Sequence, residues 1–243
     1  MSDDIQEIAE RIAAARRLTV LTGAGVSAAS GVPTFRGAGG LWRSFRPEDL
    51  ATPLAFMRNP QLVWEWYDWR RGLIARCQPN AAHEQISRWS ERDGFTLITQ
   101  NVDGLHERAG TRNAIRYHGS IWRLQCTREC GAAEWEDLRP AIVPLPPTCT
   151  SCGALARPAV VWFGESIDPS IAARADAATV CDVFLSIGTS SVVYPAAGLF
   201  HAAKARGAFT VEINPQATEA ADLVDATIAM AAEEALPLLA STW

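Results

Sequence analysis

Lysine is almost absent from this 243-residue chain: of its 22 lysine and arginine residues, only Lys204 is a lysine. The net charge is -5 and no basic cluster lies near the cysteines, which argues against a direct nucleic-acid binder. No apolar run reaches the ~18 residues of a membrane-spanning helix. The acidic start Met1-Ser2-Asp3-Asp4 does not resemble a signal peptide. We therefore expect a cytoplasmic protein that does not bind membranes.

Internal repeats and low-complexity linkers are also missing, so the chain is not expected to be a repeat array. The composition is 48% hydrophobic and 20% charged, which suits one large domain or a domain with an insertion. Six cysteines are present. In a cytosolic chain of this size they favour metal binding or free thiols over disulfides.

The apolar pattern predicts an α/β fold. Short buried runs typical of strands occupy residues 18–22, 95–99, 159–163, 180–187 and 208–213, with an edge strand expected at 224–229. Helical spacing is found at residues 3–17, 60–74, 81–92, 169–178, 195–206 and 232–239. Alternation of strands and helices indicates a parallel sheet with helices on both faces.

Residues 120–158 differ from the rest, because they hold four cysteines and five prolines with few apolar runs. Two close pairs, Cys126/Cys130 and Cys149/Cys152, are separated by 18 residues. This spacing fits tetrahedral thiolate ligation of one zinc ion. Four protein ligands leave no open position, so such a zinc would be structural. Four free thiols are the alternative.

A glycine turn follows the first strand. Gly23 and Gly25 would let the backbone approach a pyrophosphate at the start of the next helix. The spacing to Gly31 is not that of the Rossmann fingerprint, and no acidic residue stands ~20 positions later. A tight strand-to-helix turn therefore stays open as an alternative. The loop with Phe35 and Arg36 could cover a dinucleotide or be an ordinary surface loop.

The end of the second expected strand is polar and reads Thr99-Gln100-Asn101-Val102-Asp103. Ligands bind at the carboxyl ends of parallel strands, so this segment is a candidate site; a capping loop is the alternative. His118 is a candidate general base, although a lone histidine is more often structural. The other histidines, His83, His106 and His201, are interpreted as packing or surface residues.

Tyr67 and Arg70 lie three residues apart in the helix expected at 60–74, so they share one face. A phenol beside a guanidinium makes a carboxylate receptor. Spacing alone nevertheless favours an amphipathic helix with tryptophans in the core and arginines in water.

Taken together, these blocks closely resemble the sirtuins, the NAD-dependent protein lysine deacylases. The resemblance covers essentially the whole chain and rests on the motifs at 23–27, 30–36, 99–106, 118–119, 163–165, 188–190 and 212–214 and on the four cysteines. It implies a Rossmann-like large domain, formed by residues 1–36, 81–119 and 159–243. It also implies a small domain made of a helical module, 37–80, and a zinc module, 120–158.

The resemblance implies a role for each matching residue. Those expected to hold NAD are Gly23, Ala24, Gly25, Ser27, Phe35, Arg36, Gln100, Asn101, Val102, Asp103, Gly188, Thr189, Ser190, Asn214 and Ala232. Those expected to act in catalysis are His118, Asn101 and Asp103. Those expected to flank the acyl-lysine substrate are Ala51, Tyr67, Arg70, Phe163, Gly164 and Glu165.

The family reaction consumes NAD. The acyl oxygen displaces nicotinamide, and His118 then takes a proton from a ribose hydroxyl that attacks the bound imidate. Free lysine and O-acyl-ADP-ribose result. One subclass carries Tyr-x-x-Arg, which Tyr67 and Arg70 match, and removes succinyl and malonyl groups; Ala51 would leave room for the longer chain. ADP-ribosyl transfer to a protein is the alternative activity. The first cysteine pair departs from the family, since three residues separate it instead of two.

Overall fold

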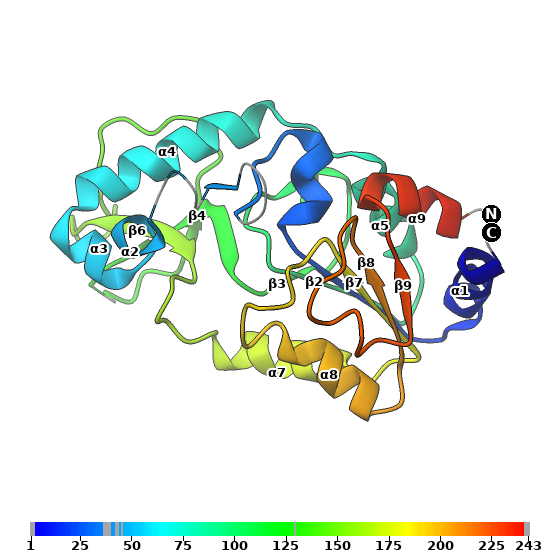
Figure 1. Ribbon diagram of the computed structural model, residues 1–243. Coiled ribbons are helices and arrows are strands. Elements are labelled where there is room, and N and C mark those ends of the chain that lie inside the picture. Colours follow the sequence, from blue (N-terminus) through cyan, green and yellow to red (C-terminus); the bar gives the residue numbers. More distant parts are fainter. Residues whose placement is uncertain (1–2, 36–39, 42–43, 45, 129, 241–243) are drawn as a thin grey trace.

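A six-stranded parallel sheet forms the larger part of the protein (Figure 1). The structure, a computed structural model, describes residues 3–35, 40–41, 44, 46–128 and 130–240. The strand order is β3-β2-β1-β7-β8-β9, and each neighbouring pair is parallel. The strands are β1 (Leu18–Thr22), β2 (Phe95–Thr99), β3 (Ile115–Arg116), β7 (Val183–Ile187), β8 (Phe209–Ile213) and β9 (Ala226–Ile228).

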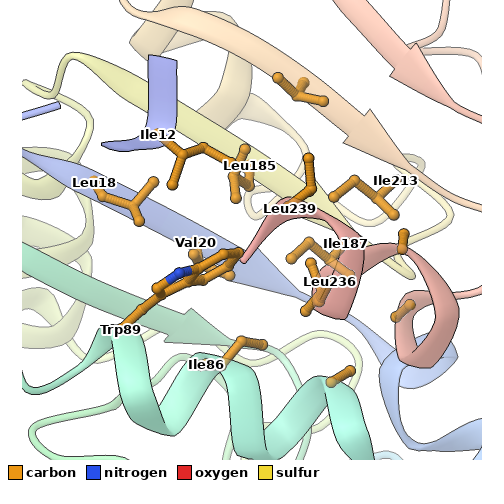
Figure 2. Packing of buried hydrophobic residues seen from close by; sticks show 14 of the residues in the cluster. Ile12, Leu18, Val20, Ile86, Trp89, Leu185, Ile187, Ile213, Leu236 and Leu239 are labelled. Atoms are coloured by element: carbon orange, nitrogen blue, oxygen red, sulfur yellow. The ribbon is translucent and has the colours of Figure 1, made fainter. Parts of the chain in front are cut away.

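Helices cover both faces of this sheet, as the sequence predicts. One face packs against α1 (Asp3–Ala14), α5 (Ala81–Trp89) and α9 (Ala232–Leu239), and the other against α7 (Pro169–Ala178) and α8 (Gly198–Ala205). The alternation along β1 explains this arrangement. Val20 lies in the cluster with Trp89 and Leu236 (Figure 2), whereas Leu21 belongs to the cluster on the opposite face.

A three-stranded antiparallel sheet forms the smaller part. Its order is β5-β4-β6, from β4 (Gly119–Cys126), β5 (Trp135–Glu136) and β6 (Ala156–Val160). The helices beside it are α2 (Pro47–Leu50), α3 (Pro53–Arg58) and α4 (Pro60–Arg76). Trp64 of α4 is fully buried and donates from Nε1 to the Ala156 carbonyl at 2.8 Å. This contact joins the helices to the small sheet.

Two sequence expectations differ from the structure. The expectation that residues 159–163 add a strand to the parallel sheet is wrong, because β6 ends at Val160 and pairs antiparallel with β4. A short apolar run indicates burial but does not say which strand lies beside it. The segment after Gly23 is a 3₁₀ helix, η1 (Ala24–Ser30), and the remaining short helix is α6 (Leu105–Arg108).

Within the described ranges, no helix has both the length and the apolarity to cross a bilayer.

Arg71 links α4 to the chain around the small sheet. Its side chain is 0% exposed. The guanidinium donates to the Ile121 carbonyl at 2.5 Å, to the Arg139 carbonyl at 2.6 Å and to Asp137 Oδ1 at 3.0 Å. Such partners offset the cost of burying a cation. Arg71 is therefore a structural residue.

Replacing Arg71 with methionine should strongly destabilise the fold. The change leaves the Ile121 carbonyl without its guanidinium donor and removes the buried cation that pairs with Asp137, whose carboxylate then keeps only Arg139. We expect a loss of about 3–5 kcal/mol in the free energy of unfolding. Urea denaturation measures this. Arg76→Met, at the exposed end of the same helix, should change the value by only about 0.5 kcal/mol. Equal effects of the two changes would contradict the structural role of Arg71.

Two buried histidines, His83 of α5 and His106 of α6, lie with their ring centres 4.8 Å apart. Burial lowers the pKa of each from 6.5 to about 3, and for His83 the charge of His106 adds to this. His83 Nδ1 lies 3.3 Å from the Asn80 backbone nitrogen and 3.1 Å from Asn80 Oδ1, and His83 Nε2 lies 3.3 Å from Ser27 Oγ. Both rings are thus neutral packing residues, as expected from the sequence.

The stability of the protein should fall with acidity because of these two rings. Above pH 6.5 they are neutral in both states. Between pH 6.5 and about 3 only the unfolded chain binds the two protons, so the free energy of unfolding drops by up to about 1.4 kcal/mol per pH unit and histidine. Urea denaturation at pH 7.5, 6.5 and 5.5 measures the slope. His106→Gln should reduce this slope, and the exposed His201→Gln should not; identical slopes would count against the mechanism.

Candidate active site

A cavity of about 840 Å³ lies where the loops after β1, β2, β7 and β8 meet residues of α4 and the segment after β6. From β1 the chain adds strands outward on one side, β2 and β3, and from β7 it adds them on the other side, β8 and β9. In open α/β sheets, ligands bind at the switch point between two such halves. The residues predicted from the sequence that line it are Gly23, Ala24, Gly25, Phe35, Ala51, Tyr67, Arg70, Gln100, Asn101, Val102, His118, Phe163, Gly164, Glu165, Gly188, Thr189, Ser190, Asn214 and Ala232. Arg36 lies outside the described residues.

The glycine turn serves a close contact between two loops. Gly25 N–H donates to the Gly188 carbonyl at 2.8 Å, and Gly23 N–H donates to the Ile187 carbonyl at 3.0 Å. A Cβ on Gly25 would come within 2.7 Å of the Gly188 Cα, and Gly188 itself has a positive φ of 59°. The glycines are therefore required for backbone-to-backbone packing, a reason that the motif alone did not show.

Ser27 and Asp103 are buried behind the cavity wall and do not line it. Ser27 Oγ donates to Asp103 Oδ2 at 2.8 Å and accepts from Asn101 Nδ2 at 3.2 Å. Asp103 Oδ1 accepts from the Leu105 backbone N–H at 2.9 Å. Burial raises the pKa of Asp103, and these hydrogen bonds oppose that rise. The network fixes the side chain of Asn101 at the cavity wall.

His118 lies in the cavity wall just before β4. Its Nδ1 is 3.2 Å from the Gln100 carbonyl oxygen, which can only accept, so Nδ1 carries the hydrogen. The lone pair is then on Nε2, and no described residue forms a hydrogen bond with that atom. Burial lowers the pKa of His118 below 6.5, although the bond to Gln100 opposes this. The ring is a neutral base at physiological pH.

Arg70 and Tyr67 line the same cavity from α4. Arg70 is only 6% exposed, and its guanidinium carbon is 4.8 Å from the Phe35 ring centre and 4.9 Å from that of Trp66. No carboxylate of the described chain forms an ion pair with it, and burial lowers its pKa. Tyr67 Oη accepts a hydrogen bond from Trp162 Nε1 at 2.9 Å. Arg70 is thus a buried cation that lies among aromatic rings.

The segment after β6 is held by an ion pair. Arg157 Nη1 is 2.5 Å from Glu165 Oε1, and Glu165 Oε2 accepts from the Trp162 backbone N–H at 2.8 Å. The Phe163 backbone N–H donates to the Ala51 carbonyl at 3.0 Å. The carboxylate of Glu165 is therefore engaged within the protein, and it shapes this wall of the cavity.

At the other end of the cavity, three polar side chains interlock. Gln100 Nε2 donates to Thr189 Oγ1 at 3.1 Å, and Asn214 Nδ2 donates to the Thr189 carbonyl at 2.8 Å. Behind them, Glu212 is buried and accepts from the Thr218 hydroxyl. These contacts connect the carboxyl ends of β2, β7 and β8.

Part of the cavity lining was not predicted from the sequence. The additional residues include Thr34, Trp66, Val160, Val161, Trp162, Ile167, Val193, Tyr194, Pro195 and the loop 215–219. Trp66 and Trp162 read as core residues in the sequence, and they are indeed buried. Trp162 lies in an apolar run and Trp66 is one of the tryptophans expected in the core, and neither pattern indicates a cavity. The loop 215–219 could have been found, since it directly follows the carboxyl end of β8.

The four cysteine sulfurs lie within 4.8 Å of one another. The Cys126 and Cys152 sulfurs are 3.5 Å apart, and those of Cys130 and Cys149 are 3.8 Å apart. Four thiolates at ~2.3 Å around one tetrahedral zinc would be separated by about 3.8 Å. The cluster therefore fits a structural zinc ion without an open coordination position.

Known proteins match this arrangement. Residues 23–195 match the Sir2 family. The NAD-dependent protein deacylase of Aquifex aeolicus (strain VF5) is 52% identical over 210 residues, which cover 86% of this chain and 87% of that protein. A solved Sir2 homologue mutant in complex with ADP-ribose has a TM-score of 0.94 at 43% identity, covering 100% of this chain and 96% of its own. A Sir2 homologue–NAD complex has a TM-score of 0.91 at 44% identity, covering 98% and 93%. With motifs, cavity and fold in agreement over nearly its full length, the chain belongs to the Sir2 family.

Proposed function

We propose that this chain removes acyl groups from lysine side chains of proteins and consumes NAD in doing so. The observation that carries the proposal is that one cavity is lined by residues of both expected sets, those for NAD and those for the acyl-lysine, with His118 in its wall. The relatives support it, because the Aquifex aeolicus protein is named an NAD-dependent protein deacylase and two similar structures hold ADP-ribose or NAD.

The dinucleotide is expected at the end of the cavity formed by the strand loops. The backbone N–H of Ala24 and the polar groups of Ser190 and Asn214 suit its pyrophosphate and ribose groups. The remaining residues proposed to contact it are Gly23, Phe35, Arg36, Gln100, Asn101, Val102, Gly188, Thr189 and Ala232, whereas Ser27 and Asp103 would act from behind the wall through Asn101. The cavity of about 840 Å³ is large enough to hold a ligand of this size.

His118 is the proposed general base. Its Nδ1–H is held by the Gln100 carbonyl, so the lone pair on Nε2 is available to take a proton from a ribose hydroxyl. NAD supplies the electrophilic anomeric carbon from which nicotinamide departs. Asn101, fixed through Ser27 and Asp103, would position the reacting sugar. The lowered pKa keeps His118 unprotonated at neutral pH.

Zinc would hold the small sheet together and take no part in the reaction. The proposed division of the chain has a larger domain of residues 1–36, 81–119 and 159–243, a helical module of residues 37–80 and a zinc module of residues 120–158, and the presence of two separate sheets supports it. A cytoplasmic location is part of the proposal, because six cysteines without a disulfide suit a reducing compartment.

His118→Ala should abolish deacylation. Loss of a general base lowers kcat by roughly 10²–10⁴-fold, while NAD binding should persist. Mass spectrometry of acetyl- and succinyl-lysine peptides, with and without NAD, measures acyl loss and nicotinamide release. Acyl loss from wild type without NAD would contradict the proposal. Nicotinamide release with ADP-ribose attached to a protein, and no acyl loss, would instead favour ADP-ribosyl transfer.

Acidic acyl groups are the proposed preferred substrates. A buried guanidinium without a carboxylate partner among the described residues is costly unless a ligand supplies the anion. Arg70 faces the cavity beside Tyr67, whose hydroxyl hydrogen remains available because its oxygen accepts from Trp162. A succinyl or malonyl carboxylate could bind both groups. The small side chain of Ala51 in the same wall leaves room for the longer acyl chain.

Arg70→Met should lower kcat/KM for succinyl-lysine roughly ten- to hundredfold relative to acetyl-lysine, because a charge-assisted hydrogen bond contributes about 1.5–3 kcal/mol. Steady-state kinetics with the two peptides at saturating NAD measures the ratio. Arg76→Met, on the exposed end of the same helix, is the matched control and should leave the ratio unchanged. Equal losses on both peptides in the Arg70 variant would refute the carboxylate receptor.

A further inference from the structure

Trp162 forms a hydrogen bond with Tyr67 of the proposed carboxylate receptor, and both residues line the cavity. It follows β6, is 3% exposed and donates from Nε1 to Tyr67 Oη at 2.9 Å. The two residues are 95 positions apart in the chain. Neither the helix that carries Tyr67 nor the motif around Phe163 predicts this contact.

The hydrogen bond fixes the direction of the tyrosine hydroxyl. An indole N–H can only donate, so the tyrosine oxygen must accept, and its own hydrogen is left for a different acceptor. No described residue accepts that hydrogen, and Tyr67 lines the cavity together with Arg70. Burial also raises the pKa of Tyr67, so the hydroxyl keeps its hydrogen.

The indole is itself held firmly. The Arg157 guanidinium carbon lies 3.4 Å from the ring centre of Trp162, and the Phe56 ring lies at 5.3 Å on a tilted plane. Arg157 is in turn paired with Glu165, which also binds the Trp162 backbone N–H. An indole packed in this way has little freedom to turn its N–H away from Tyr67.

We propose that Trp162 is a positioning residue for acyl selectivity: its Nε1–H orients the Tyr67 hydroxyl so that the hydroxyl donates to the distal carboxylate of an acidic acyl group. The inference rests on the proposed preference for such groups and adds a residue that acts through Tyr67. An acetyl group has no carboxylate, so the orientation of Tyr67 matters far less for its removal.

The test compares Trp162→Phe with wild type on succinyl- and acetyl-lysine peptides at saturating NAD. Phenylalanine keeps an aromatic ring but has no N–H. We expect the succinyl-to-acetyl ratio of kcat/KM to fall roughly three- to tenfold, the effect of one hydrogen bond, and the loss to lie mainly in KM for the succinyl peptide. Trp64→Phe is the matched control, because it removes another buried indole hydrogen bond that does not involve Tyr67. It should lower the thermal midpoint and leave the ratio unchanged.

A double-mutant cycle separates positioning from packing. In a Tyr67→Phe background there is no hydroxyl to orient, so Trp162→Phe should not lower the ratio further. If Trp162→Phe fails to fold, incorporation of 3-benzothienylalanine at position 162 supplies the same test, since this tryptophan isostere has sulfur in place of the N–H.

The outcomes are distinct. A wild-type enzyme that removes acetyl but no succinyl groups overturns both the proposed acyl preference and this inference. A wild-type enzyme that removes both, with the same ratio in the position-162 variants, overturns the inference alone. Additive losses in the Tyr67→Phe background would likewise show that Trp162 does not act through Tyr67.

Discussion

The contact between the loops after β1 and β7 sets the geometry of the whole cavity. Gly23 and Gly25 donate backbone hydrogen bonds to Ile187 and Gly188, and a side chain at Gly25 would collide with the Gly188 backbone. The loops can approach this closely only because glycine has no Cβ. This contact therefore positions the cavity residues of both loops, such as Ala24 after β1 and Ser190 after β7.

Burial controls the chemistry on the opposite wall. The same loss of water lowers the pKa of His118, raises that of Tyr67 and leaves Arg70 a cation among aromatic rings. Burial thus favours a neutral base and a protonated phenol, whereas Arg70 stays a cation in spite of burial because the ordinary pKa of a guanidinium is high. Together they make one part of the cavity suited to proton transfer and another suited to an anion.

The two sheets contribute different parts of this arrangement. The loops of the parallel sheet form the end proposed for the dinucleotide, whereas α4 and the segment after β6 form the end proposed for the acyl group. His118 lies at the junction, directly before β4 and bonded to the end of β2 through Gln100. Arg71 and Trp64 attach α4 to the small sheet.

Local pattern in the sequence determined much of this protein. Apolar periodicity predicts the strands at Leu18–Thr22 and Phe95–Thr99 and the helix at Ala232–Leu239. The spacing of the four cysteines predicts their cluster. Both patterns depend on residues that are near one another in the chain. The loop residues at the cavity could be named from their motifs. Only the tertiary structure decided that β6 pairs with β4, that Ser27 and Asp103 lie behind the wall, and that Trp162 reaches Tyr67. These three features depend on contacts between segments far apart in the chain. A local sequence pattern does not indicate which distant segments will pack together.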